Sequence, residues 1–256
     1  MIAFISRRTA VLALLVICVT QPAQARLCTE KNFEGDAYIV CAIDPAASDL
    51  RLFWRNAQGA PYRTFSNVAK ALENRRENLI FAINAGMYQS DFSPLGLYVE
   101  EGKELRPADT TTMNGPPRQI PNFYKKPNGI FFLSQTGAGI LPTENFLELQ
   151  LDVRFATQSG PMLVIEGELH PALIPDSTDR TRRGGVGVCK DGEVRFAISE
   201  GRVNFHDFAR LFRDQLECPN ALFLDGGRGT GLYLPQMRRD DFSWHGGYGP
   251  IFGLVK

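Results

Sequence analysis

Short apolar runs that end in one polar residue and then small residues are the feature that most limits the fold. Ala221 to Leu224 leads into Asp225-Gly226-Gly227, and Leu79 to Ile83 leads into Asn84-Ala85-Gly86. Each run has the length and composition of a buried strand. The polar residue then comes where the strand leaves its sheet, and the glycines suit a tight turn or a loop that a ligand approaches closely.

Further segments of the same kind predict a protein built mainly from strands. Apolar runs bounded by turn residues lie at 37–43, 50–54, 129–133, 153–157, 161–165, 186–189 and 194–198. Residues 95–105 suit a hairpin with its turn near Gly102. The segment 108–128 is rich in Thr, Pro, Asn and Gly, so we expect a long surface loop there.

Two helices are expected. Apolar residues recur at helical spacing from Phe205 to about Leu216, and Asn204 suits the N-cap position. A shorter helix is expected from Val68 to Arg76, capped by Ser66. With no fixed-period repeat and no Ser- or Pro-rich linker, the sequence predicts a single α+β domain with a mostly antiparallel or mixed β-sheet core.

The N-terminus is typical of a secretory signal peptide. Arg7 and Arg8 precede an apolar stretch from Ala10 to Val19, and Ala23-Gln24-Ala25 suits a cleavage site. We therefore expect residues 1–25 to be removed, leaving a domain of residues 26–256 that is periplasmic or secreted. The general secretory route is favoured, and twin-arginine export stays open. No later apolar stretch is long enough to suggest a membrane span after cleavage.

The charge balance argues against a nucleic-acid partner. The expected signal peptide carries two of the 28 basic residues and no acidic one, so the mature chain has 26 basic against 28 acidic residues. Affinity for a phosphate backbone comes mainly from clustered Lys and Arg, which a near-neutral surface does not offer.

Four cysteines remain after the signal peptide takes Cys18 with it. An even number in an exported protein suggests disulfides rather than a metal site or a catalytic thiol. Of the three possible connectivities we favour the two pairs that are local in sequence, namely Cys28 with Cys41 and Cys189 with Cys218.

Several common active-site motifs are missing from the sequence. It contains no GxSxG elbow, no Walker A sequence and no HExxH, and its three histidines are His170, His206 and His245. Gly227-x-Gly229-x-Gly231 has the wrong final spacing for a dinucleotide-binding loop. We therefore expect no cofactor and assign no metal ligand. A divalent cation stays possible.

The remaining polar groups at strand ends suit sugar chemistry. An oxocarbenium-like centre favours nearby negative charge, and sugar hydroxyls need paired hydrogen bonds. Asp225 and, as a second carboxylate, Glu200 supply the first requirement. The second is met by amide, hydroxyl and guanidinium groups at Asn84, Gln158, Ser159, Arg182 and Arg183.

A series of six motifs carries a resemblance to a known family. In chain order they are FAINAGMY (81–88), SPLGLYVEEGK (93–103), KPNGIFFL (126–133), TQSGPMLVIEGELHP (157–171), RRGGVGV (182–188) and ALFLDGG (221–227). This series resembles that of the phosphodiester glycosidase family, especially its exported bacterial branch. The resemblance implies a hydrolase that cuts the glycosidic bond of a sugar-1-phosphodiester and releases a free sugar and a phosphomonoester.

The resemblance also implies where the site lies. Arg183 matches the arginine of the family's Arg-x-x-x-Gly pattern and is the expected guanidinium for a phosphate leaving group. Asp225 is expected to orient or deprotonate water or to hold sugar hydroxyls. The expected partner is a phosphorylated saccharide, and its expected contacts are Asn84, Gly86, Gln158, Ser159, Gly160, Gly226 and Gly227.

One departure from the family pattern keeps alternatives open. Better-known members continue from LDGG with Gly and Ser, whereas this chain has Arg228-Gly229-Thr230. The loop therefore suits a different sugar or phosphate arrangement. Two other hypotheses are a glycan-binding protein without activity and a metal-assisted phosphodiesterase. The sequence leaves the sugar, the stereochemical outcome and the oligomeric state open.

Overall fold

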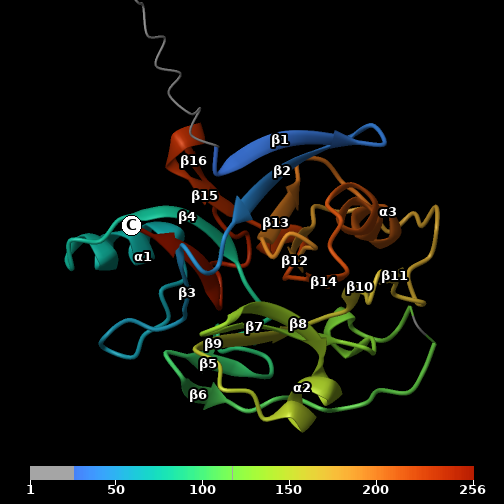
Figure 1. Ribbon diagram of the computed structural model, residues 1–256, viewed down its shortest axis with the longest axis horizontal. Helices are drawn as coiled ribbons and strands as arrows, with labels where there is room; N and C mark the ends of the chain where they lie inside the picture. Colours follow the sequence, from blue (N-terminus) through green and yellow to red (C-terminus); the bar gives the residue numbers. More distant parts are fainter. Residues whose placement is uncertain (1–25, 117) are drawn as a thin grey trace, which may run out of the picture.

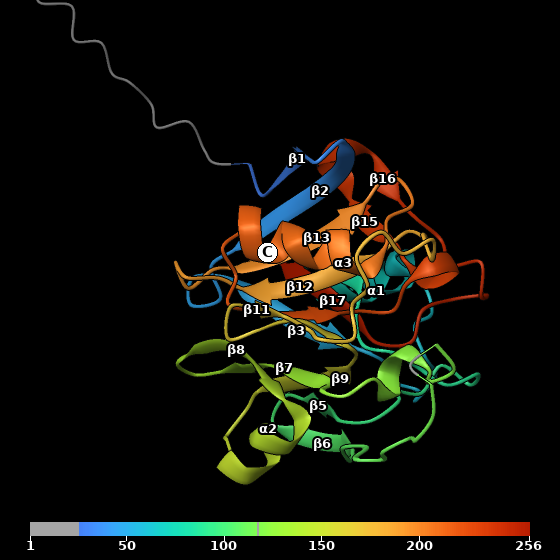
Figure 2. The same ribbon diagram turned by 90° about the vertical axis from the view of Figure 1, so that its right-hand side faces the viewer.

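Three antiparallel sheets make up the scaffold (Figures 1 and 2). The computed structural model describes residues 26–116 and 118–256, and the expected signal peptide lies outside them. Every strand pair in this part of the chain is antiparallel, and three short α-helices accompany the sheets. The predicted α+β fold with a single β-rich domain is therefore confirmed.

The largest sheet has seven strands in the order β1-β2-β13-β12-β14-β10-β11. Their bounds are β1 Cys28–Phe33, β2 Asp36–Ile43, β13 Val194–Ser199, β12 Gly184–Val188, β14 Asn220–Phe223, β10 Met162–Ile165 and β11 Glu168–Leu169. The expected strands at 37–43, 161–165, 186–189 and 194–198 all belong to it.

Two five-stranded sheets complete the scaffold. One has the order β16-β15-β4-β17-β3, with β16 Arg239–Asp240, β15 Leu232–Leu234, β4 Leu79–Asn84, β17 Ile251–Val255 and β3 Asp49–Phe53. The other has the order β6-β5-β9-β7-β8, with β6 Lys103–Arg106, β5 Tyr98–Glu100, β9 Phe155–Ser159, β7 Gly129–Ser134 and β8 Gly137–Pro142. This last sheet lies below the other two in both views.

A cluster of phenylalanines fills the centre where the three sheets meet. Phe196 of β13 lies 5.3 Å from Phe81 of β4 and 5.1 Å from Phe252 of β17, measured between ring centroids. Phe131 of β7 lies 5.2 Å from Phe252 in an edge-to-face arrangement. All four side chains are buried, so one apolar core joins the sheets into a single unit.

Each α-helix packs on a different sheet. α1 (Phe65–Glu73) buries Phe65, Val68 and Leu72 beside β4. Its N-cap is Thr64, whose side-chain oxygen accepts a hydrogen bond from the Asn67 backbone N–H at 3.1 Å. The predicted Ser66 cap is therefore wrong, because Ser66 already lies inside the helix. The sequence analysis did not predict α2 (Thr143–Leu149), which packs on the sheet containing β7.

The predicted amphipathic helix is confirmed, with a change of helix type in its second half. α3 (Phe205–Arg210) starts at the N-cap Asn204, as expected, and continues as a π-helical segment, η2 (Leu211–Gln215). Phe208 and Phe212 are buried against the seven-stranded sheet. The remaining short helices are 3₁₀ turns, η1 (Asn122–Tyr124), η3 (Gly227–Gly229) and η4 (Pro235–Met237).

Both predicted disulfides are present. Cys28 bonds to Cys41, which is its direct cross-strand partner between β1 and β2. Cys189, just after β12, bonds to Cys218, just before the neighbouring strand β14. Each closed loop is expected to stabilise the fold by about 3 kcal/mol on a chain-entropy estimate.

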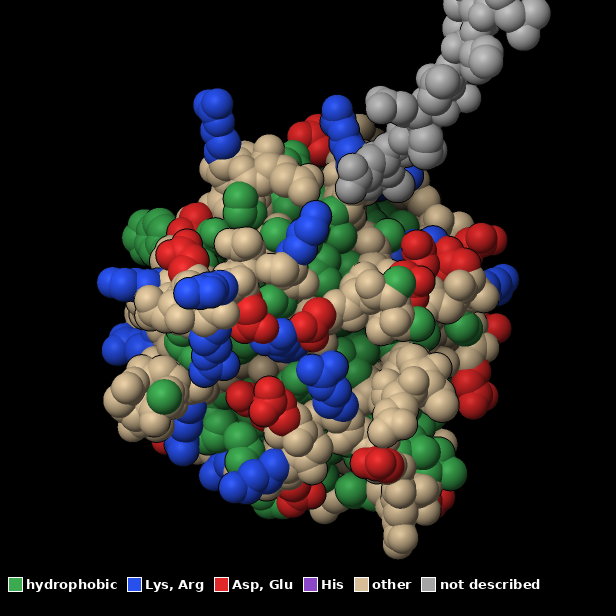
Figure 3. All heavy atoms as spheres, turned by 60° about the vertical axis from the view of Figure 1, so that its left-hand side comes forward, with side chains coloured by type: hydrophobic (Ala, Val, Ile, Leu, Met, Phe, Trp, Pro, Cys, Tyr) green, Lys and Arg blue, Asp and Glu red, His purple; other side chains and the backbone are tan. Residues whose placement is uncertain are grey.

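The surface carries mixed charge. On the face shown in Figure 3, acidic and basic side chains alternate rather than forming a field of one sign. No helix among residues 26–116 and 118–256 combines the length and the apolar character that crossing a membrane requires.

Candidate active site

The buried side-chain amide of Asn84 connects the end of β4, through hydrogen bonds, to the loop that follows β14. Asn84 Nδ2 donates to the Asp225 carbonyl oxygen at 2.7 Å, and the Gly231 backbone N–H donates to Asn84 Oδ1 at 3.0 Å. The Asp225 backbone N–H also donates to the Ala85 carbonyl oxygen at 3.2 Å. Asn84 is thus a clamp that holds both ends of the loop 225–231. Because it bonds to backbone groups, its direct contact with substrate stays a prediction.

Asp225 is a half-buried carboxylate without a cationic partner among the described residues. Burial raises the pKa of Asp225 to about 6, and only the Gly226 backbone N–H opposes this shift. A carboxylate with this pKa exchanges a proton near neutral pH, which suits acid–base work at a reacting centre.

The glycines after Asp225 shape the space around its carboxylate. Gly227 adopts a left-handed φ of 63°, which favours glycine. A Cβ on Gly229 would overlap Asp225 Oδ2, and it would lie 3.6 Å from His245 Nδ1. The Asp225 carboxylate and the His245 imidazole therefore both lie next to the place where a side chain on Gly229 would project.

The sequence analysis did not identify His245 as a site residue. It lies in the Gly-rich segment 243–249, where no local pattern distinguishes it from a surface histidine. Only its approach to Gly229, sixteen positions earlier in the chain, would have drawn attention to it, and that approach depends on the tertiary fold.

Tyr88 borders the same space. Its hydroxyl donates to the Gly247 carbonyl oxygen at 2.9 Å. Burial, with a smaller contribution from the Asp225 charge, raises the pKa of Tyr88 to about 12, so the phenol is a hydrogen-bond donor near neutral pH. The loop 84–92, which leaves β4, thus faces the Asp225 loop.

Gln158 of β9 already has four hydrogen bonds. Its Oε1 accepts from the backbone N–H groups of Leu97 at 3.0 Å and Asp109 at 2.9 Å. Its Nε2 donates to the Asp109 carbonyl oxygen at 2.7 Å and to Thr143 Oγ1 at 3.1 Å. The side chain is buried, so these bonds give Gln158 the task of anchoring the start of the long loop.

The other predicted residues near the end of β9 lie at points of close packing. A Cβ on Gly86 would overlap the Gln158 carbonyl oxygen, and one on Gly160 would lie 2.8 Å from the Phe123 carbonyl oxygen. Ser159 is buried, and its Oγ has no hydrogen-bond partner among the described residues. For these three residues, contact with a saccharide stays a prediction.

Arg183 points away from the Asp225 carboxylate. The backbone beside it meets the loop, since the Gly227 N–H donates to the Arg182 carbonyl oxygen at 2.9 Å. The Arg183 side chain instead donates through Nε to the Val203 carbonyl oxygen and through Nη2 to that of Asp179, both at 2.9 Å. Its guanidinium carbon lies 3.5 Å from the centroid of the Phe205 ring, and the side chain is only 1% exposed.

These contacts give Arg183 a bracing function between the segments 179–183 and 203–205. Burial lowers the pKa of Arg183 to about 10, so the guanidinium stays charged at neutral pH. Because the side chain is only 1% exposed, a direct phosphate contact would require the groups that cover the guanidinium to move.

Glu200, the second predicted carboxylate, also lies apart from Asp225. It is exposed just after β13, and its Oε1 accepts from Arg239 Nη1 at 2.7 Å. Arg239 also pairs with Asp241, which in turn accepts from Arg182 at 3.2 Å. The structure therefore places Glu200 in a surface ion-pair network.

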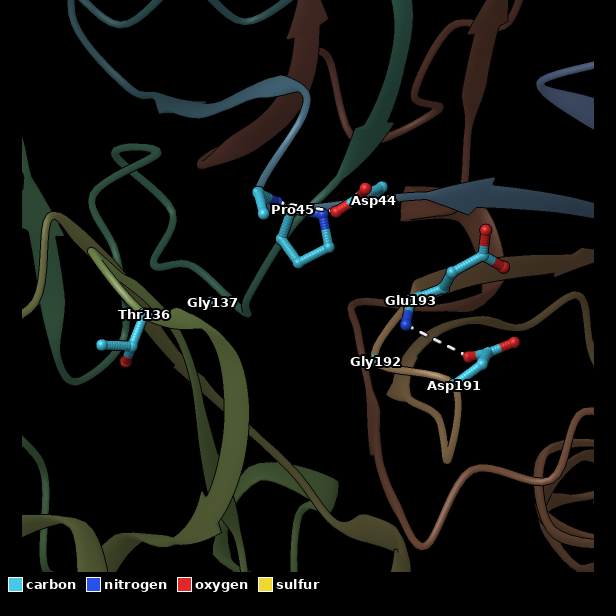
Figure 4. Close-up of a pocket in the computed structure, with 8 residues that line it drawn as sticks. Asp44, Pro45, Thr136, Gly137, Asp191, Gly192 and Glu193 are labelled. Carbon is cyan, nitrogen blue, oxygen red and sulfur yellow. Dashed lines mark hydrogen bonds between the residues drawn. The ribbon is translucent and has the colours of Figure 1, made fainter.

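A separate hollow of about 480 Å³ lies between the β7–β8 and β12–β13 hairpin turns and the turn that follows β2 (Figure 4). It is bordered by Asp44 and Pro45, by Thr136 and Gly137, and by Asp191 to Glu193, and it contains none of the predicted site residues. Its three acidic side chains would repel a phosphate group. Among residues 26–116 and 118–256, no group of three or more His, Cys, Asp and Glu side chains is arranged to hold a metal ion.

The fold and the site define a class of protein. A carboxylate of raised pKa among hydrogen-bonding groups at strand ends of an antiparallel α+β scaffold suits acid–base chemistry. Residues 77–248 match the family described as phosphodiester glycosidase. The chain therefore belongs to the phosphodiester glycosidase family, as the sequence motifs predicted.

A curated relative supports the assignment. The chain is 30% identical over 184 residues to the uncharacterized protein YigE of Escherichia coli strain K12, an alignment that covers 72% of this chain and 69% of YigE.

Solved structures share the fold at low sequence identity. The catalytic domain of zebrafish N-acetylglucosamine-1-phosphodiester alpha-N-acetylglucosaminidase, auto-inhibited by its pro-peptide, gives a TM-score of 0.61 at 15% identity, covering 89% of this chain and 81% of that one. A hypothetical protein from Synechocystis gives 0.53 at 16% identity, covering 89% and 61%. A putative exported protein from Burkholderia pseudomallei gives 0.51 at 13% identity, covering 86% and 74%.

Proposed function

We propose that this protein is an exported hydrolase that cleaves the glycosidic bond of a sugar-1-phosphodiester in an envelope or extracellular glycan. Family membership supports a glycosidase-type activity. The two disulfides and the expected signal peptide support a periplasmic or secreted location. The single observation that carries the proposal is the half-buried Asp225 carboxylate, with its pKa raised to about 6 and no ion-pair partner in the described part of the chain.

In the proposed reaction, water attacks the anomeric carbon and the bond between this carbon and the phosphate oxygen breaks. The electron pair of that bond leaves with the phosphomonoester, and a proton of the attacking water passes to ionised Asp225. Negative charge beside the anomeric carbon also stabilises an oxocarbenium-like transition state. A phosphate leaving group accepts the negative charge readily, so it depends little on a proton donor.

Neighbouring residues complete the proposed site. His245 lies where its imidazole can bond to the water or to the departing phosphate, opposite Asp225 across Gly229. Arg228 is exposed on the same loop, and its guanidinium has no ion-pair partner among the described residues. We therefore assign the phosphate contact to Arg228 and a positioning function to Arg183. The proposal gives Glu200 no direct part.

The remaining predicted residues act on the shape of the site in this proposal. Asn84 fixes the loop 225–231, and Gly226 and Gly227 leave its backbone open to the sugar phosphate. Ser159 is buried, and its hydroxyl has no hydrogen-bond partner among the described residues, so a saccharide contact with it remains part of the proposal. Gln158, Gly86 and Gly160 support the packing around the end of β9.

The proposal is tested with the purified protein on a panel of sugar-1-phosphodiesters, with and without a chelator. We expect release of a reducing sugar, and we expect Asp225→Asn to lower kcat by about 100-fold or more. The matched control is Asp152→Asn, because Asp152 is exposed and has no side-chain partner among the described residues. Control turnover should equal that of the unmodified protein.

Other results would support the competing hypotheses. Saccharide affinity without product after long incubation would indicate a glycan-binding protein. Turnover that a chelator abolishes and a divalent cation restores would favour a metal-assisted phosphodiesterase. Full turnover by Asp225→Asn would remove Asp225 from the mechanism.

A further inference from the structure

Two exposed aromatic side chains stand out on the surface. Phe242 is 62% exposed and Trp244 is 71% exposed, and their ring centroids lie 4.7 Å apart at an interplanar angle of 52°. Every other exposed large apolar side chain among residues 26–116 and 118–256 is aliphatic or a methionine, with at most 58% exposure. Adjacent exposed aromatic rings of this kind mark surfaces that bind a partner or ligand.

The loop that carries these rings is held in place on several sides. The Asp241 backbone N–H donates to the Leu232 carbonyl oxygen at 3.0 Å, and the Trp244 N–H donates to that of Arg228 at 3.1 Å. Farther along, Tyr88 donates to the Gly247 carbonyl oxygen. Ser243 is buried between the two exposed residues. The backbone therefore holds both rings outward at a defined place rather than on a free tail.

That place adjoins the candidate active site. Trp244 bonds through its backbone to Arg228, which lies on the loop that begins with Asp225. His245, the next residue, lies with its Nδ1 3.6 Å from the point that a Cβ on Gly229 would occupy, beside the Asp225 carboxylate. The segment that carries the aromatic pair is thus in direct contact with the loop that carries the Asp225 carboxylate.

The chemistry of this region suits a carbohydrate. One face of a pyranose ring presents C–H bonds, which pack well on aromatic rings, while its hydroxyl edge needs hydrogen-bond partners. Arg228 and His245 are exposed beside the aromatic pair and supply such partners. Ligand sites generally combine apolar or aromatic walls with a few polar groups in this way.

We propose that Phe242 and Trp244 form a sugar-binding platform that holds a pyranose ring of the glycan next to the bond that is cleaved. The identity of this glycan rests on the proposed function, but the binding itself does not require turnover. The platform gives the protein a preference for glycans that extend beyond a single sugar phosphate.

Tryptophan fluorescence offers a direct test, because the chain contains only two tryptophans. Trp54 is buried in the core, so the accessible signal comes from Trp244. We would titrate the full chain carrying Asp225→Asn with oligosaccharides and with sugar-1-phosphodiesters. We expect saccharides to shift the emission to shorter wavelength and to protect Trp244 from acrylamide quenching.

Variants then locate the binding. We expect Trp244→Ala and Phe242→Ala each to weaken saccharide affinity, measured by calorimetry, by about 10-fold. In the active protein, Trp244→Ala should raise KM for an extended glycan by about 10-fold. Leu149→Ala is the matched control, since Leu149 is 58% exposed and lies on α2.

Three results would overturn the platform. The first is that saccharides do not bind at Trp244. This would be seen as no protection of Trp244, or as unchanged saccharide affinity in Trp244→Ala. The second is a dimer in analytical ultracentrifugation that Trp244→Ala abolishes, which would make the pair an interface between copies. The third is protection by phosphatidylcholine–phosphatidylglycerol vesicles alone. Saccharide binding without hydrolysis would refute the proposed reaction and leave the platform intact.

Discussion

At the scale of single residues, the proposed mechanism depends on the protonation of Asp225. The carboxylate is half-buried and forms no ion pair within residues 26–116 and 118–256, so burial dominates its pKa and raises it to about 6. Several carboxylates in ion pairs elsewhere in the chain show the opposite behaviour. For example, hydrogen bonds from Arg51 hold the pKa of Asp49 below its usual value.

The pH dependence of turnover follows from this pKa. In the proposed mechanism the ionised form of Asp225 accepts the proton, so kcat/KM should rise with pH and reach half its plateau near pH 6. Initial rates across pH 4.5 to 8, at constant ionic strength, provide the check. A rate that falls with increasing pH through this range would instead assign Asp225 the part of a general acid.

The pH dependence of the free energy of unfolding gives a second, independent measure of the pKa of Asp225. The pKa is higher in the folded state than in the unfolded state, so the native protein binds more protons between about pH 4 and 6, and stability falls as pH rises through this window. Asp225→Asn removes the buried charge. It should therefore raise the free energy of unfolding at pH 8 by about 2 kcal/mol, a gain that shrinks towards pH 4.

Thermal melts at both pH values test this expectation. A gain of about 2 kcal/mol corresponds to a melting temperature higher by about 4–8 °C in a chain of this size. An Asp225→Asn variant that is less stable than the parent at pH 8 would show that the carboxylate has a partner that stabilises its charge.

The absence of a side chain at Gly229 keeps the carboxylate in position. A Cβ there would overlap Asp225 Oδ2, the end of a flexible side chain, so Gly229→Ala should displace the carboxylate without unfolding the protein. We expect kcat to fall by about 10- to 100-fold while the melting temperature changes little. Gly201→Ala is the control, because nothing lies within 4 Å of its added Cβ. Equal turnover by both variants would contradict this geometry.

At the scale of elements, each polar residue at a strand end has a distinct task. Asn84 at the end of β4 ties down the loop after β14, and Gln158 near the end of β9 ties down the start of the long loop. The same sequence signal, a polar residue after an apolar run, marks both residues. It does not say whether the side chain turns toward a ligand or back onto the protein's own backbone.

Replacing Gln158 tests its anchoring task. Gln158→Leu keeps the side-chain size but removes four hydrogen bonds. It leaves the buried Leu97 N–H and two half-buried backbone groups of Asp109 without these partners. We expect a loss of about 2–4 kcal/mol in the free energy of unfolding. Hydrogen exchange should speed up selectively at the amides of Leu97 and Asp109.

The matched control is Gln58→Leu, because Gln58 is exposed in a turn. Exchange that speeds up evenly over the whole chain in Gln158→Leu would show a general loss of stability rather than release of the loop.

Sequence patterns predicted the elements well where local rules act. The strand ending at Asp225, the strand ending at Asn84 and the helix capped by Asn204 follow from apolar runs and capping chemistry. Thr64 rather than Ser66 caps α1. Both residue types are good N-caps, so packing rather than the local sequence decides where the helix begins.

The sequence could not show which residues that are far apart in the chain lie close together in the fold. The placement of His245 beside Asp225 depends on β15, β16 and the turns between them, none of which carries a strong local signal. The side-chain direction of Arg183 depends on Phe205, twenty-two positions away. Motif order therefore predicted the family, whereas the fold was needed to show which of the predicted site residues lie close together.

At the scale of the whole molecule, the site lies where the three sheets meet. Asn84 ends β4 in one five-stranded sheet, Ser159 ends β9 in the other, and Asp225 follows β14 in the seven-stranded sheet. The phenylalanine cluster joins the same three sheets from inside. A rigid junction of this kind is a suitable support for loops that must hold a carboxylate in a precise position.

The central claim is that the protein breaks the bond between the anomeric carbon and oxygen, with Asp225 acting on the attacking water. Hydrolysis of a sugar-1-phosphodiester in heavy-oxygen water, followed by mass spectrometry of the phosphomonoester, tests it most directly, because the free sugar can exchange oxygen with water and the phosphate does not. The account predicts a phosphomonoester without label. Heavy oxygen in the phosphate would show cleavage between phosphorus and oxygen and would contradict the account.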